Sequence, residues 1–248
     1  AALRLRAALD GGLATVEGEL SSPNLQSEQL LRSPETIDFG TVSVEIAVRP
    51  EVAKVDINNA SSELIVQLLR NSGLSPRYSK RIADEIVAGQ LSENRWGNNN
   101  IGDDPSHSHT RYKFDTLSEL TLLKDGNSDL LTCLAPDITV FTHSIDVDSS
   151  TASPRVGQAL VALNPAAGVQ KGLLSAGITS AIGGRPDLYE ITETAKDGNS
   201  QISNTRQTVL RITGDLKKPA WILAETSPAP SETDATAACA RLKSIGTD

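Results

Sequence analysis

Acidic and histidine side chains gather in one polar stretch of this 248-residue chain, between residues 89 and 111. Two aspartates and two histidines there could bind a divalent metal, because carboxylates and a His-x-His pair are good ligands for such ions. These residues are Asp103, Asp104, His107 and His109. The surrounding serines and asparagines favour a solvated loop instead. We interpret the stretch as a loop and keep a metal centre as the alternative.

Oxygen-bearing side chains at two other places could bind calcium, which prefers carboxylate and amide oxygens. Asp146 and Asp148 precede a predicted helix, and the other candidates lie in turns near predicted strands, namely Asp197, Asn199 and Asp215. The same residue types are common in turns, where they accept hydrogen bonds from nearby backbone N–H groups. Each residue therefore fits a turn by itself, and a calcium site built from some of them is the alternative.

Three basic side chains follow a turn between two predicted helices: Arg77, Lys80 and Arg81. A helix-hairpin-helix module can bind a DNA phosphate through backbone N–H groups at a helix start. Pro76 removes one such group, and the net charge of −8 opposes broad attraction to phosphate backbones. We expect no nucleic-acid binding, and a helix-hairpin-helix nucleic-acid-binding module is the alternative function.

The sequence contains no recognisable catalytic arrangement. His143 has no nearby serine or cysteine motif that would identify it as a general base. The pair Gly183-Gly184 lacks the Lys-Ser/Thr that completes a phosphate-binding loop. Aromatic residues make up 3% of the chain, which argues against ligand cages built from rings. These observations predict a non-enzymatic protein.

A short pattern that precedes a helix occurs twice, and it is the most informative feature of the chain. Residues 54–64 and 144–153 each place an apolar-Asp-apolar-Asn/Asp element before an apolar helix, and the second copy has two more residues before its alanine. Asn58 and Ser61 of the first copy can cap free N–H groups at the helix start. The repeat therefore predicts two similar helix starts and needs no ligand.

Apolar periodicity predicts the order of the elements. A helical stripe comes first, formed by Leu5, Leu9, Val16 and Leu20, and residues 41–48 then alternate as a strand. Helices are expected around residues 64–69, 82–87, 116–123, 130–134 and 154–163, and strands at 138–141, 188–194, 207–213 and 220–224. The last three strands predict an antiparallel meander, across which the first helix would pack.

This order indicates an α+β fold in which a helical domain interrupts a discontinuous body. Residues 1–50 and 187–226 would form the body, with an N-terminal helix packed on an antiparallel sheet. Residues 51–186 would form a large inserted α-helical domain. Residues 227–248, which are rich in Pro, Ser, Thr and Ala, would form a C-terminal tail.

The two cysteines, Cys133 and Cys239, lack the C-x-x-C spacing of metal and redox sites. They could form one structural disulfide, which suits an extracytoplasmic protein. They could equally remain two separate thiols. A disulfide would hold the C-terminal tail, which otherwise frays.

Several of these segments, taken in order, resemble the K-type minor pseudopilin of the bacterial type II secretion system. The matching residues are 5–12, 55–61, 114–120, 134–140, the second copy of the repeat, and the strand residues 208–212 and 221–223. The resemblance extends to about residue 225. The segment after residue 86 departs from the family, which usually has a Trp-Arg-Asp-containing sequence there, and Asp148 stands where asparagine is common.

The resemblance implies a pilin-like body and a position at the tip of a periplasmic pseudopilus, where the chain would cap or initiate the filament with the I- and J-type subunits. It implies anchoring in the inner membrane by a preceding helical segment, calcium binding in the body, and in some relatives a disulfide. We expect the apolar face of the first helix, with Leu5, Leu9 and Val16, to bind the partner subunits. A calcium-dependent adhesion domain is a further alternative.

Overall fold

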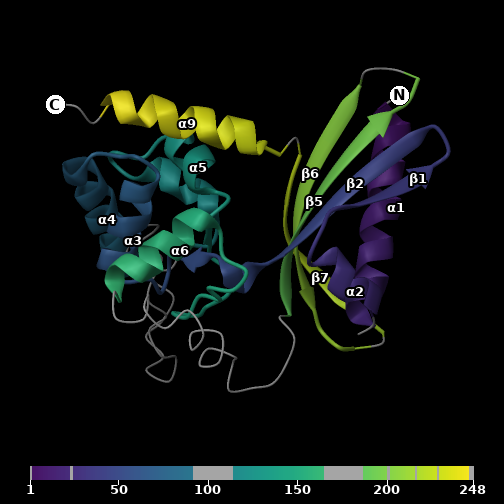
Figure 1. Cartoon of the computed structure of the whole chain (residues 1–248), viewed down its shortest axis with the longest axis horizontal. Coiled ribbons are helices and arrows are strands. Elements are labelled where there is room, and N and C mark those ends of the chain that lie inside the picture. The colour runs from purple at the N-terminus through teal and green to yellow at the C-terminus, as the bar shows by residue number, and fades with distance from the viewer. Residues whose placement is uncertain are drawn as a thin grey trace, which may run out of the picture. The chain divides into compact units, whose positions relative to one another are not determined.

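A computed structural model describes residues 2–22, 25–91, 114–164, 187–199, 202–215, 217–227 and 229–245. The chain divides into two compact units, which are described separately below (Figure 1). Unit 1 comprises residues 1–52 and 182–230, and unit 2 comprises residues 53–181 and 231–248. The predicted combination of helices with an antiparallel sheet is confirmed.

Unit 1 is built on a five-stranded antiparallel sheet with the order β1-β2-β5-β6-β7. Its strands are β1 (Glu35–Phe39), β2 (Val42–Pro50), β5 (Leu188–Asp197), β6 (Ser203–Ile212) and β7 (Ala220–Thr226). The predicted meander of β5, β6 and β7 is confirmed. Strand β1 is not evident in the sequence, because most of its side chains are exposed and two of its residues are acidic.

Helix α1 (Ala2–Ser21) packs along one face of this sheet, against β2, β5 and β6, and the short helix α2 (Leu25–Leu30) follows it (Figure 1). Gly12 permits the close approach, because a Cβ there would lie 2.8 Å from Glu193 Oε1 and 3.1 Å from Ile46 Cδ1. The predicted packing of the first helix across the meander is therefore confirmed. The core of unit 1 comprises Leu5, Ala8, Leu9, Leu13, Val16, Leu20, Leu30, Val42, Val44, Ile46, Val48, Tyr189, Ile191, Ala195 and Leu210.

A buried ion pair links β5 and β6 on the side of the sheet that α1 covers. The Nε of Arg206 donates to Glu193 Oε2 at 2.9 Å, and its Nη1 donates to Asp10 Oδ1 of α1 at 2.6 Å. The Glu193 side chain is fully buried. Burial raises the pKa of the Glu193 carboxyl, and the hydrogen bond from Arg206 offsets this only in part. The charged form of Glu193 therefore depends on Arg206.

We expect Arg206→Met to lower the free energy of unfolding by about 3 kcal/mol near neutral pH, because it leaves a buried carboxylate without its partner. The loss should shrink as the pH falls toward the pKa of Glu193, since a protonated carboxyl needs no cation. Urea unfolding at about pH 7 and about pH 5 measures both effects. The control, Arg206→Met with Glu193→Leu, should regain most of the stability. A single variant as stable as the wild type near neutral pH would contradict this account.

Unit 2 is mainly helical. Its first elements are the 3-10 helix η1 (Glu51–Ala53), which begins at the boundary with unit 1, and the strands β3 (Val55–Asp56) and β4 (Ile138–Thr139), which pair in parallel. Its helices are α3 (Ser62–Asn71), α4 (Pro76–Leu91), the 3-10 helix η2 (Leu117–Leu122), α5 (Ser128–Leu134) and α6 (Pro154–Leu163). A single apolar core joins them, with fully buried members such as Leu69, Ile82 and Leu130.

The predicted turn and cap signals of unit 2 are confirmed. Gly73 has a φ of 91° in the turn between α3 and α4, a conformation that glycine adopts at little cost. Ser61 caps α3 by accepting a hydrogen bond from the backbone N of Leu64 at 3.2 Å. At the start of η2, the Oε1 of Glu119 accepts a hydrogen bond from the backbone N of Thr116 at 2.9 Å.

The prediction that residues 227–248 form a tail is wrong. Residues Glu232–Ile245 form helix α9, which packs on α5 in unit 2 (Figure 1). Cys239 of α9 forms a disulfide with Cys133 of α5, with the two Cα atoms 4.9 Å apart. The buried face of α9 consists largely of small side chains, namely Ala235, Ala238, Cys239 and Leu242. Such a face gives a weak periodic signal, which explains why the helix is not evident in the sequence.

Candidate functional site

The apolar face of α1 is part of the core of unit 1. Leu5 and Leu9 are each 2% exposed and Val16 is 1% exposed. The expectation that these side chains bind partner subunits is therefore wrong, because the sheet of the same chain already covers them. Leu3, in the first turn of α1, is by contrast 82% exposed.

The acidic candidates in unit 2 form a turn. Oxygen atoms of Asp148 accept hydrogen bonds from the backbone N and Oγ of Ser150, at 2.9 and 2.6 Å, and from Thr151 Oγ1 at 2.9 Å. Burial disfavours the charge, but these hydrogen bonds outweigh it and lower the pKa of the Asp148 carboxyl. Asp146 is exposed. In the part of the chain that the structure describes, no three His, Cys, Asp or Glu side chains are grouped to hold a metal ion.

The candidates in unit 1 also make local turn bonds. Asp197 Oδ1 accepts a hydrogen bond from the backbone N of Asn199 at 3.0 Å, and Asp215 Oδ1 accepts one from the backbone N of Lys217 at 2.8 Å. Calcium binding by any of these residues stays a prediction. The loop candidates lie outside the described residues: Asp103, Asp104, His107 and His109.

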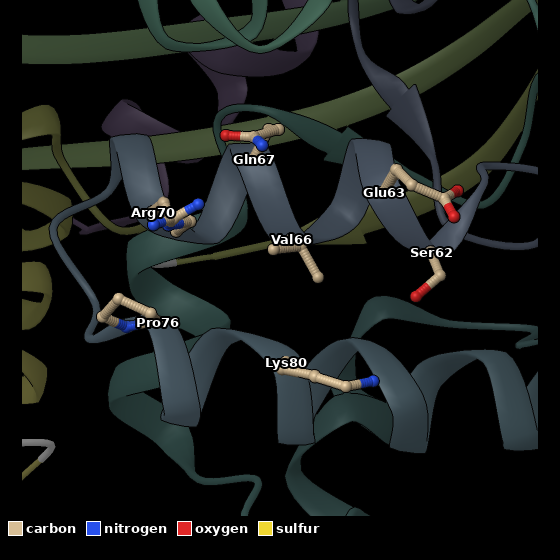
Figure 2. A pocket seen from close by; sticks show the side chains of 7 residues that line it. All are labelled: Ser62, Glu63, Val66, Gln67, Arg70, Pro76 and Lys80. Carbon is tan, nitrogen blue, oxygen red and sulfur yellow. The ribbon is translucent and has the colours of Figure 1, made fainter. Parts of the chain in front are cut away.

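A groove of about 360 Å³ lies between α3 and α4. Figure 2 shows Val66 pointing from α3 toward α4, while Lys80 extends along α4. The groove places Glu63 beside two cations and therefore presents no single charge to a ligand. Its lining residues are Ser62, Glu63, Val66, Gln67, Arg70, Pro76 and Lys80.

Two of the three basic residues considered for DNA binding are neutralised by neighbours. Lys80 Nζ lies 3.0 Å from Asp84 Oδ2, and Arg81 Nε lies 2.7 Å from Asp125 Oδ2. Arg77 is exposed. Because phosphate binding depends on available cationic side chains, this geometry lends the helix-hairpin-helix alternative little support. The absence of nucleic-acid binding stays a prediction.

The two copies of the repeat match without an insertion. Asp56 and Asp148 each accept a hydrogen bond from the backbone N–H two residues later, at 2.8 and 2.9 Å. Five residues after each aspartate, Ser61 caps α3 and Ser153 caps α6. The predicted two-residue insertion in the second copy is therefore wrong, because Asp148 corresponds to Asp56.

Other polar side chains of the first copy join distant segments of unit 2. Asn58 does not cap α3, since its Nδ2 donates to the carbonyl oxygen of Phe114 at 2.9 Å and its Oδ1 accepts from the backbone N of Phe114 at 2.6 Å. The Oδ2 of Asp56 accepts hydrogen bonds from Thr142 Oγ1 at 2.9 Å and from the backbone N of His143 at 2.7 Å. These contacts explain the polar residues of the repeat as structural.

Strand β7 carries an exposed apolar pair that sequence reasoning overlooked. Trp221 is 51% exposed and Ile222 is 55% exposed. The signal available in the sequence is a Trp-Ile-Leu run without alternation, preceded by two lysines.

The fold of this chain occurs in a solved secretion-system structure. A chain in the crystal structure of the GspK–GspI–GspJ complex, from the type 2 secretion system of enterotoxigenic Escherichia coli, matches 92% of this chain and 96% of its own length. The TM-score is 0.63 and the sequence identity is 12%. The two chains share a fold. The resemblance to the K-type minor pseudopilins is thereby confirmed at the level of the fold.

No protein-family model and no curated protein matches the sequence. Among the described helices, none is both long and apolar enough to span a bilayer.

Proposed function

We propose that this chain is a minor pseudopilin of a type II secretion system, with a structural role and no catalytic one. The shared fold over nearly the full length of both chains carries the proposal. Two features of the fold suit this role, namely a long helix lying along an antiparallel sheet and a large helical domain inserted into that body.

In this role the chain assembles with the I- and J-type minor pseudopilins, since the matching structure is named as a complex of three such proteins. It sits at the tip of the pseudopilus, on the periplasmic face of the inner membrane, and caps or initiates the filament. The disulfide supports this location, because disulfides persist in oxidising compartments such as the periplasm. Calcium binding by carboxylate oxygens belongs to the proposal as a stabilising factor.

Native mass spectrometry of the chain with purified I- and J-type subunits, with and without a calcium chelator, tests the proposal. We expect a stable one-to-one-to-one complex, and its loss in chelator would show that calcium supports assembly. An unrelated pilin-like protein of similar charge serves as the control for non-specific association. If well-folded cognate subunits form no complex with the chain, the proposed function fails.

A further inference from the structure

The helix of unit 1 leaves one strand of the sheet uncovered. Helix α1 packs against β2, β5 and β6, and β7 lies beyond them at the sheet edge. Directly paired residues of neighbouring strands share a face, so Ile222 lies beside the buried Leu210 on the α1 side, and Trp221 lies beside Arg211 on the opposite side. Both faces of β7 therefore present a large apolar side chain to solvent.

The two edges of the sheet differ in chemistry. Strand β1 carries Glu35 and Asp38, and charged side chains protect an edge strand against unwanted pairing. Strand β7 has no charged residue from Ala220 to Ala224. Its edge therefore lacks the protection that β1 has.

The unpaired backbone groups of β7 lie on its outer side. The backbone N of Thr213 donates to the carbonyl oxygen of Pro219 at 2.9 Å, so the backbone of Pro219 faces β6. Because backbone direction alternates along an antiparallel pair, Ala220 and Ile222 direct their N–H and C=O groups away from β6. These groups are free to pair with another strand.

Two lysines give this edge a charge preference. Lys217 and Lys218 are exposed just before β7, although the chain as a whole carries a net charge of −8. The Nζ of Lys218 lies 4.0 Å from the ring centroid of Trp221, a cation–π contact that partly covers the ring. An acidic side chain on an approaching strand would find cations at this end of β7.

We propose that β7 is the docking edge for a β-strand of a neighbouring minor pseudopilin, whose acidic side chain faces Lys217 and Lys218. The strand extends the sheet through the outward backbone groups of Ala220 and Ile222, and its apolar side chains cover Trp221 and Ile222. This inference rests on the proposed function, and it assigns the partner contact to β7 in place of the apolar face of α1.

Titration of wild type and variants against the I- and J-type subunits tests the proposal. Ile222→Lys and Trp221→Ser should each weaken the affinity about 30-fold or more, because central apolar anchors dominate interfaces. The matched control is Ile202→Lys, at a side chain of unit 1 that is 50% exposed and lies off β7. Thermal unfolding should show all three variants folded. Amide hydrogen exchange of residues 220–224 should slow when the complex forms.

The outcomes separate the two proposals. If the wild type binds and the β7 variants bind equally well, the docking edge is wrong and the proposed function stands. If the wild type binds no partner, both proposals fail together. A wild-type homodimer that Ile222→Lys dissociates would also overturn the inference, since a second copy would then occupy the edge.

Discussion

Replacing Leu9 with aspartate is expected to unfold unit 1. Leu9 is 2% exposed and belongs to the core between α1 and the sheet. Removing such a side chain down to alanine costs about 2–5 kcal/mol, and the carboxylate adds the penalty of an unpaired buried charge. Because domains are stable by only about 5–15 kcal/mol, the variant should lose most of the amide protection of α1 and of β2, β5 and β6.

Hydrogen exchange resolved by peptide measures this loss, and Leu3→Asp is the matched control. Leu3 lies on the same helix and is 82% exposed, so its replacement should change the free energy of unfolding by less than about 0.5 kcal/mol. A folded Leu9→Asp variant that fails to bind partner subunits would instead restore the docking role first predicted for this face.

Removal of the disulfide should be the next most damaging change. The bond joins residues 106 positions apart, and closing a loop of about 100 residues is worth about 4.7 kcal/mol in the chain-entropy model. The double variant Cys133→Ala/Cys239→Ala should therefore unfold at a lower guanidinium concentration. Helix α9 should detach first, because apart from Cys239 its buried side chains are Leu242 and two alanines.

The control for the disulfide is Arg241→Ala, which breaks an exposed ion pair between α9 and Asp129 with an N–O distance of 2.6 Å. Exposed pairs contribute little to stability, so this variant should keep α9 protected from hydrogen exchange. If the double cysteine variant unfolds at the wild-type midpoint with α9 still protected, packing and not the covalent bond holds the helix.

Local signals predict much of unit 2. The helix expected at residues 154–163 is α6, with the same bounds. Caps such as Ser61 involve residues three apart, and the turn at Gly73 involves a single backbone conformation. Such signals depend on neighbours in sequence and are therefore readable without the fold.

Elements supported mainly by distant segments were harder to predict. Strand β1 exists because it pairs with β2, and its own residues carry a weak pattern. Asn58 looks like a helix cap in the sequence, yet it bonds to the backbone of Phe114, 56 residues away. In each case the deciding partner is remote, and one sequence does not reveal which remote segment will be adjacent.

The sequence by itself determined the order of the predicted elements, the α3–α4 hairpin, the capped helix starts and the α+β class. Tertiary structure decided that β2 pairs with β5, that Cys133 meets Cys239, and that Leu9 is core while Trp221 is exposed. The physical reason is that periodicity shows which face of an element is apolar, because it reflects local geometry. What covers that face depends on the path of the whole chain, and here the sheet covers α1 while the edge at β7 remains open.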